Sequence, residues 1–399
     1  MANEPATYQP TPDRPRTMPR GLYPACALAI AVGLITFIIG AARPDPAPAW
    51  RALLVNFLFW SSVAQGAFIW AVAFRLARTT WSAPINRLGL SFIGFFPVGI
   101  IVLIVLFFGR NYYLPWIGMD LGDRRLWLNV PFVFLRDGVG LLALFVLGLA
   151  YVRTYLAVDQ ATTRPEHAGT EEIERASRRL SVLGILLALV YFAVYTLLAF
   201  DLAMSLIPTW HSTLFGWYFA LGGLYVGMAA LIVMAVTLRR WLGVAEQIGP
   251  ARFLDLGNLL MAFAMAMTYF FFAQALVIWY ENLPHEVSFA IPRVNFQPGR
   301  ALSWLVVGTC YLGPFALLVV REMKENPRTL LPVALLAMVG MWLERYMLVM
   351  PSLAARPGEV PLLTLLIGIG FLGIMVSITA RFLARYPAQS ALDLVLEKD

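Results

Sequence analysis

Charged side chains interrupt the apolar stretches of this chain at a few positions. Arg136 and Asp137 lie near the start of one stretch, and Glu344 and Arg345 lie deep in another. A charge in the hydrocarbon core of a bilayer is costly, so it normally faces the interior of a helix bundle, where it meets a partner or water. A carboxyl group held there can accept and release a proton, and a nearby arginine favours its ionised form. Since adjacent residues point about 100° apart on a helix, we expect Glu344 and Arg345 to find their partners on other helices.

More titratable and hydroxyl groups lie at or near the ends of these stretches. Most of them fall at one level, toward the face that we predict to be outer. Asp255, Tyr191 and Tyr195 lie in the inner half and offer a weaker, inward route. The alternative is that the charges only tie helices together. The candidate proton-path residues are Asp137, Asp201, Glu344, His211, Asp255, Tyr191 and Tyr195, with Arg136 and Arg345 as their charge partners.

Ten apolar stretches position these residues, and each is long enough as a helix to cross a bilayer core of about 30 Å. The chain has 399 residues, of which 60% are hydrophobic and only 13% charged, as expected when lipid is the solvent. We predict an all-α polytopic membrane domain over 22–385, preceded by a disordered tail (1–21) and followed by a short tail (386–399). The predicted spans are 22–41, 53–76, 88–108, 132–154, 179–200, 213–238, 256–280, 301–320, 330–350 and 361–383.

The distribution of basic residues predicts the orientation. Most of the 30 Lys and Arg residues lie in the N-terminal tail and in alternate connections, among them 75–87, 153–179 and 239–252. Because cytoplasmic segments carry the excess of positive charge, both termini are predicted to be cytoplasmic. The connection from Val158 to Arg179 is predicted to hold a short surface helix with a solvated charged face.

Histidine and cysteine positions bear on redox cofactors. His167, His211 and His285 all fall in connecting segments, so the helices offer no histidine to ligate a haem. Cys26 and Cys310 lack CxxC or CxxCH spacing, and we interpret both as small packing residues. Basic residues at span ends set topology and do not indicate nucleic-acid binding. We therefore expect no metal or covalent cofactor here, and any redox centre to belong to another chain.

Several segments of the chain closely resemble the F subunit of alternative complex III, a relative of the NrfD and polysulfide-reductase membrane anchors. The most distinctive is 199–219 (AFDLAMSLIPTWHSTLFGWYF), which runs from a span end through a Pro-Trp turn into the next span. The resemblance covers roughly residues 50 to 385. The other matching segments are 81–87 (WSAPINR), 255–263 (DLGNLLMAF), 278–284 (IWYENLP) and 342–351 (WLERYMLVMP).

The resemblance implies two four-helix bundles, made of spans two to five and six to nine and flanked by spans one and ten. It implies a subunit of a quinol-oxidising complex in a respiratory or photosynthetic chain of a bacterial inner membrane. Such a subunit supports a quinone site, or translocates or releases protons, without redox cofactors of its own. The implied partners are a homologous NrfD-like subunit, iron–sulfur and multihaem cytochrome c subunits, and quinone or menaquinone. Glu281, His285 and Trp210 are the candidates for contact with the quinone.

Two departures from the family pattern favour a helper subunit over one that oxidises quinol independently. The turn after span five reads Ile207-Pro208-Thr209-Trp210 where Asp-Pro-His-Trp is common, and Gly89 and Leu90 stand where an acidic residue is frequent. A purely structural anchor for cofactor-bearing chains is the first alternative. A secondary transporter is the second, but Pro97 and Pro314 do not obviously match between the two halves, as such a transporter would require.

Overall fold

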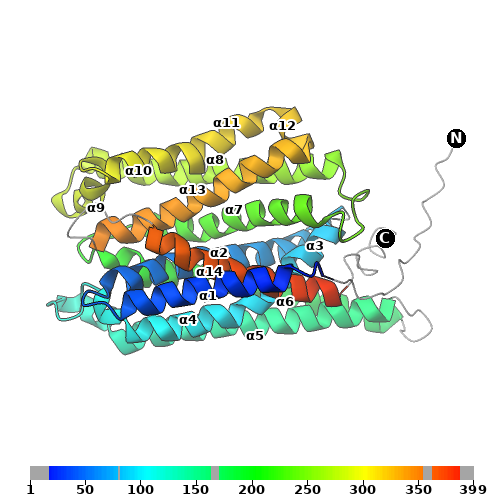
Figure 1. Cartoon of the computed structure of the whole chain (residues 1–399), viewed down its shortest axis with the longest axis horizontal. Coiled ribbons are helices and arrows are strands. Elements are labelled where there is room, and N and C mark those ends of the chain that lie inside the picture. Colours follow the sequence, from blue (N-terminus) through cyan, green and yellow to red (C-terminus); the bar gives the residue numbers. More distant parts are fainter. Residues whose placement is uncertain (1–17, 80, 163–169, 354–361, 387–399) are drawn as a thin grey trace.

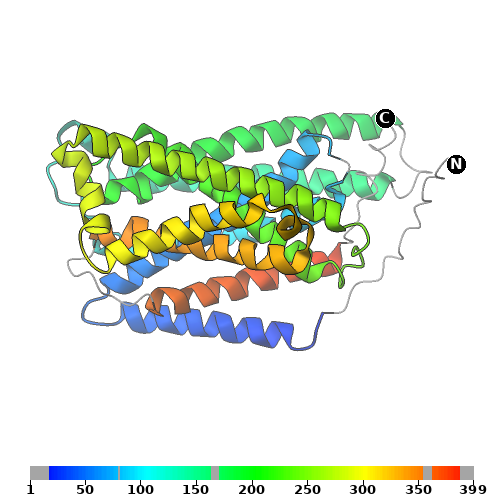
Figure 2. The ribbon, with the colours of Figure 1, turned by 90° about the horizontal axis from the view of Figure 1, so that it is seen from above.

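The computed structural model describes residues 18–79, 81–162, 170–353 and 362–386, and all the regular secondary structure in this part is helical. Ten of its helices are long and apolar enough to cross a membrane, and they run along one common axis (Figures 1 and 2). These spans are α1 (Leu22–Ala41), α2 (Ala47–Leu76), α3–η1–α4 (Ala83–Leu90, Ser91–Phe95, Phe96–Phe108), α5 (Val130–Thr162), α6 (Thr170–Leu202), α7 (Thr213–Leu238), α8 (Pro250–Glu281), α10–η5–α11 (Gly299–Val306, Val307–Leu312, Gly313–Val319), α13 (Pro327–Leu353) and α14 (Leu362–Arg385).

The prediction of an all-α, ten-span membrane protein is confirmed, but several span ends were predicted too short. Helix α5 continues to Thr162 and α6 already begins at Thr170, so the short surface helix predicted to lead into the fifth span is the N-terminal part of α6 itself. Glu, Arg and Ala are good helix formers, so the helix continues into water beyond the apolar stretch. Residues 163–169, with His167, and most of both predicted tails lie outside the described residues.

The spans form two rings of four. In the first bundle α2, α3–α4, α5 and α6 each pack against their neighbours in the ring, and in the second bundle α7, α8, α10–η5–α11 and α13 do the same. Helix α1 packs on α14, which in turn packs on α2 and η1 at the edge of the first bundle. This is the arrangement that the family resemblance implied.

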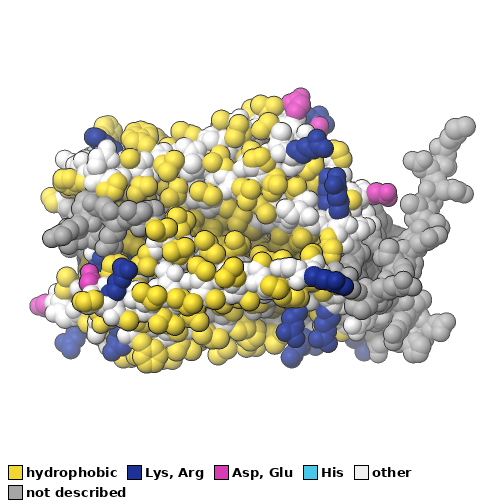
Figure 3. All heavy atoms as spheres, in the orientation of Figure 1, with side chains coloured by type: hydrophobic (Ala, Val, Ile, Leu, Met, Phe, Trp, Pro, Cys, Tyr) yellow, Lys and Arg dark blue, Asp and Glu magenta, His cyan; other side chains and the backbone are white. Residues whose placement is uncertain are grey.

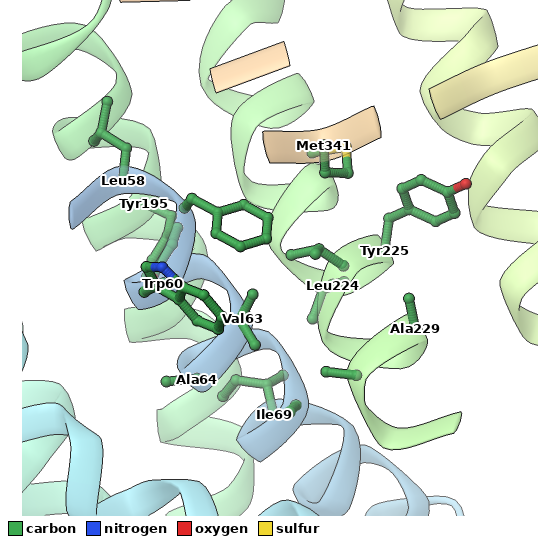
Figure 4. Close-up of a cluster of buried hydrophobic side chains, with 14 of the residues drawn as sticks. Leu58, Trp60, Val63, Ala64, Ile69, Tyr195, Leu224, Tyr225, Ala229 and Met341 are labelled. Atoms are coloured by element: carbon green, nitrogen blue, oxygen red, sulfur yellow. The ribbon is translucent and has the colours of Figure 1, made fainter. Parts of the chain in front are cut away.

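Helices α2 and α7 join the two bundles. A methyl group added to Gly66 would overlap the carbonyl oxygen of Gly223, and one added to Gly227 would overlap the backbone of Gly66 and Ala67. Side chains such as Val63 and Leu224 fill the space beside this contact (Figure 4). Small residues allow helices to approach closely. The resulting van der Waals packing holds the helices together in lipid, where there is no hydrophobic driving force for their association.

Hydrogen bonds from long side chains to backbone carbonyls reinforce this interface. The indole of Trp70 donates to Leu224 O (2.8 Å), and the hydroxyls of Tyr191 and Tyr195 donate to Ala220 O (2.8 Å) and Ser61 O (2.6 Å). Each of these bonds fixes one helix against the main chain of another.

The lateral surface is apolar. A broad band of hydrophobic side chains separates the two ends of the molecule, where the charged side chains gather (Figure 3). Helices α1 and α8 are the least covered spans, with only 11% of their most apolar stretch buried. They therefore present their side chains to lipid or to a neighbouring chain.

Two spans are broken. The third span changes to a 3₁₀ segment at Ser91–Phe95 ahead of Pro97, and the eighth changes to a π-helical segment at Val307–Leu312 ahead of Pro314. These are the second helix of the first bundle and the third helix of the second bundle. The two breaks therefore do not lie at matched positions.

We expect replacement of Gly66 by alanine to lower the free energy of unfolding by about 2 kcal/mol or more, because its Cβ would overlap backbone atoms that cannot move aside. The measurement is an SDS titration in mixed micelles, followed by tryptophan fluorescence. Gly99→Ala is the matched control, since nothing lies within 4 Å of the added methyl. Equal stability of the two variants would contradict the importance of this close packing.

Candidate functional site

An arginine–aspartate pair closes one end of the first bundle. This is the end at which α5 begins, which the basic residues predict to face outward; it is called the outer end below. Arg136 on α5 forms a two-pronged salt bridge with Asp201 in the last turn of α6, through Nε to Oδ2 (2.5 Å) and Nη2 to Oδ1. Trp127 lies under the guanidinium at 3.9 Å and donates its indole N–H to Asp201 (3.2 Å). The three side chains satisfy most of each other's polar atoms, and Asp201 is fully buried among them.

Asp137 lies beside this pair but differs from Asp201 in its hydrogen bonding. Its side chain is 1% exposed, and neither carboxylate oxygen has a hydrogen-bond partner among the described residues. The charged groups that act on it are Asp201 and Arg136. A buried carboxylate without donors is costly, so this position favours the uptake of a proton. Arg136, Asp137, Asp201 and Trp127 are called the Asp137 cluster below.

Tyr113, in the connection that follows α4, borders this cluster. Its hydroxyl donates to Leu106 O (3.0 Å). Burial raises the pKa of the Tyr113 phenol above its ordinary value, and the charge of Asp137 raises it further. Tyr113 is therefore neutral at physiological pH, and its proton is used in the hydrogen bond to Leu106 O.

A second group of polar side chains lies inside the second bundle. Glu344 is 3% exposed and Arg345 is fully buried. Both have the expected partners on another helix, since Tyr218 and Phe219 of α7 bond Glu344 and Arg345. They also pair with each other, which the helical spacing did not predict: Arg345 Nη1 donates to Glu344 Oε2 of the adjacent residue (2.8 Å). Phe219 on α7 explains this, because its ring lies 3.7 Å from the guanidinium and its carbonyl accepts from Nη2 (3.2 Å). The long side chain is thus held where it can reach back to its neighbour.

Two tyrosines complete this second group. The hydroxyl of Tyr218 on α7 donates to Glu344 Oε1 at 2.6 Å and lies 2.6 Å from the hydroxyl of Tyr311 in η5. Neither tyrosine was a candidate from the sequence, because nothing in the spacing of Tyr218 on one span links it to Tyr311 on another. Glu344, Arg345, Tyr218 and Tyr311 are called the Glu344 cluster below.

A third ion pair lies at the opposite, inner end of the first bundle. Arg87, which falls in a predicted cytoplasmic connection, is fully buried in α3 and pairs with Asp159 of α5 (2.5 Å). Its guanidinium lies 5.1 Å from the Tyr155 ring. Helix α3 begins at Ala83 because Pro84 favours the first turn of a helix, and this start draws Arg87 into the bundle.

The other candidates at the outer end lie around helix α9 (Pro284–Val294). Trp210 is buried and stacks on Phe289 at 4.0 Å, and Phe289 in turn lies 3.7 Å from the guanidinium of Arg293. Arg293 donates to the last carbonyls of α13, at Met347 and Leu348. Burial lowers the pKa of Arg293 below its ordinary value, and Glu344 opposes that shift. Trp210 is thus linked to the C-terminal part of α13 through two intermediate side chains, Phe289 and Arg293.

The remaining histidine and acidic candidates are exposed. The rings of His211 and His285 stack at the outer end with centroids 6.0 Å apart, and Glu281 is exposed at the end of α8. Asp255 lies at the inner end of α8 beside Arg252 (3.8 Å), in a different bundle from α6, which carries Tyr191 and Tyr195. The structure therefore places these candidates outside the two buried clusters.

Cys26 and Cys310 form no disulfide, and both are buried, as expected for packing residues. Within the described ranges, no three His, Cys, Asp or Glu side chains gather as they would around a metal ion. Comparison with models of known protein families and with curated protein sequences finds no match to this chain. The chemistry of the site therefore follows from its own geometry.

The Arg136–Asp201 pair should be essential to stability. Asp201→Ala leaves a buried guanidinium without its partner, and we expect the free energy of unfolding to fall by about 3 kcal/mol. Replacing both residues, as Arg136→Met with Asp201→Leu, should restore most of that stability. Glu171→Ala is the control, because the exposed Glu171–Arg175 pair contributes only about 0.5 kcal/mol. SDS titration measures all four proteins, and a double variant no more stable than Asp201→Ala would contradict this role of the pair.

Proposed function

We propose that this chain is an integral membrane subunit of a quinol-oxidising electron-transport complex in a bacterial inner membrane, with both termini in the cytoplasm. In this proposal it holds no redox centre. Iron–sulfur and multihaem cytochrome c subunits carry the electrons, and a homologous NrfD-like subunit lies beside it. Oxidation of a quinol such as menaquinol releases two protons, and each needs an acceptor near the site of reaction. This chain supports the quinone site and supplies such acceptors toward the outer face.

Asp137 is the observation that carries this proposal. A carboxyl group whose two oxygens are buried and lack donors destabilises the fold unless it is protonated. A residue that only tied helices together would have a partner, as Asp201 and Asp159 have. The position of Asp137 is therefore better explained by the transfer of protons than by stability.

An open groove beside the Asp137 cluster supports the same proposal. It has a volume of about 610 Å³, and its lining combines apolar Phe132 and Leu135 with polar Asn129 and Arg125. Phe132 also lies 4.7 Å from the guanidinium of Arg136. An amphipathic ring dissolved in the outer part of the membrane could therefore approach to within one side chain of the Arg136–Asp201 pair.

The structural alternative has its own support. Arg136–Asp201 and Arg87–Asp159 each join two helices of the first bundle, as expected of a subunit whose charges only hold the membrane sector together. The transporter alternative is weaker, because the breaks at Ser91–Phe95 and Val307–Leu312 occupy unequal positions in the two bundles. The buried carboxyl of Asp137, which lacks a hydrogen-bond donor, is the feature that distinguishes the proposed function from the structural alternative.

Replacement of Asp137 by leucine or asparagine is the test, made in the assembled complex. We expect quinol turnover to fall by about tenfold or more, because these variants lack the proton acceptor. The free energy of unfolding should stay the same or rise, since an unsatisfied buried carboxyl is removed. Asp45→Asn, in the exposed outer connection between α1 and α2 and outside this groove, is the control and should change neither quantity. Wild-type turnover in both Asp137 variants would favour the structural alternative.

A further inference from the structure

Three side chains of the second bundle form a hydrogen-bonded chain with a fixed direction. The Tyr218 hydroxyl has one proton, which it donates to Glu344 Oε1 at 2.6 Å. The Tyr311 hydroxyl, 2.6 Å away, must therefore be the donor to Tyr218. The bonds run Tyr311 to Tyr218 to Glu344, and all three groups are buried. A proton can pass along a row of hydroxyl and carboxyl groups that are joined by short hydrogen bonds.

The π-helical segment Val307–Leu312 places Tyr311 in this line. Helix α13 approaches it so closely at Gly340 that an added Cβ would lie 2.6 Å from Cys310 N. The carbonyl of Cys310 accepts a hydrogen bond from Tyr225 (2.9 Å), which satisfies a backbone group that the changed helix geometry would otherwise leave unpaired. Such π-helical turns occur frequently at functional sites.

The two ends of the hydrogen-bonded chain meet different surroundings. At the tyrosine end, the ring of Phe271 on α8 stacks on Tyr311 with centroids 5.0 Å apart, and Phe271 is itself 38% exposed on the lateral surface. Tyr311 is thus one ring away from lipid. At the carboxyl end Glu344 is held by Arg345, so a negative charge on Glu344 is stabilised when no proton is present.

We propose that Tyr311 and Tyr218 are a proton relay that carries a proton from a membrane-dissolved hydroxyl donor, arriving beside Phe271, to Glu344. The donor O–H bond breaks and its proton binds Tyr311 Oη, while the Tyr311 proton moves to Tyr218 Oη and the Tyr218 proton moves to Glu344 Oε1. Both tyrosines end neutral, Glu344 ends neutral, and the donor keeps the negative charge. That the donor is a quinol rests on the proposed function, whereas the relay rests on this chain alone.

The other titratable groups facing Glu344 are few. They are Arg345 on its own helix, Arg293 on α9, and the Cys310 thiol beside Tyr311 in η5. Arg345 and Arg293 are cations that donate hydrogen bonds. Tyr311 and Tyr218 are therefore the hydroxyl groups through which a proton reaches the Glu344 carboxyl.

The first measurement follows protonation of Glu344 in the full-length protein, reconstituted in lipid nanodiscs. A membrane-soluble acidic phenol, the probe that stands for the hydroxyl donor, is mixed in at constant bulk pH, and infrared spectroscopy follows the carboxyl C=O band that is absent from Glu344→Gln. Tyr311→Phe and Tyr218→Phe should each slow the rise of this band by at least about tenfold. Tyr195→Phe is the matched control, because it removes a buried tyrosine hydroxyl that donates to a backbone carbonyl in the first bundle, away from η5, and it should leave the rate unchanged.

Phe271→Ala, which uncovers Tyr311, should raise the same rate severalfold. Wild-type rates in Tyr311→Phe would overturn the relay, and an unchanged rate in Phe271→Ala would overturn the lipid-facing donor side. If Tyr218→Phe fails to fold, Tyr311→Phe still tests the relay, since it removes only the first hydroxyl of the hydrogen-bonded chain.

Quinol turnover of the assembled complex separates this inference from the proposed function. Slower protonation of Glu344 together with slower turnover in Tyr311→Phe supports both. Slower protonation with wild-type turnover supports the relay and counts against a quinol as its donor.

Discussion

The close backbone approach of α2 and α7 is the constraint on which the rest of the structure depends. Gly66, Gly223 and Gly227 let the two helices touch, and lipid offers no hydrophobic driving force that could hold them together if larger residues forced them apart. This approach brings Tyr191 and Tyr195 of α6 within reach of carbonyls on α7 and α2. It also fixes the two buried clusters on either side of one interface, so that each bundle holds its own carboxyl groups.

Aromatic rings help the membrane interior to accommodate the buried charges. Arg136 lies over Trp127, Arg345 over Phe219, Arg293 over Phe289 and Arg87 over Tyr155, at 3.7 to 5.1 Å from the ring centroids. A guanidinium is planar, weakly hydrated and suited to stacking, whereas an ammonium group is compact and strongly hydrated. This explains why the buried ion pairs use arginine. Each ring also restricts the arginine to one position, and at Arg345 that restriction decides which carboxylate it meets.

Hydropathy was enough to predict ten spans, because the apolar length of a bilayer-crossing helix is a local property. The ends of α2, α5 and α6 were not predictable in this way, since helices continue into water wherever propensity allows. Asp137 and Glu344 were identified as candidates because a carboxyl group within an apolar stretch can be recognised from the sequence alone. Tyr218 and Tyr311 were not, because a tyrosine in a span is ordinary until the fold brings two of them together. Partners of Glu344 and Arg345 on another helix were predicted correctly, but their bond to each other was not, since helical spacing ignores the reach of a long side chain held by Phe219.

The π-helical segment Val307–Leu312 also constrains the length of the protein. A π-type turn accommodates one residue more than the α-helix around it. Deleting one residue of this segment other than Tyr311 would let the span close into a continuous α-helix with both flanks still in register, but the wider turn that presents Tyr311 would be lost. Tyr311 would then turn away from α7 although its identity is unchanged. In this span, the number of residues is as strict a requirement as their chemistry.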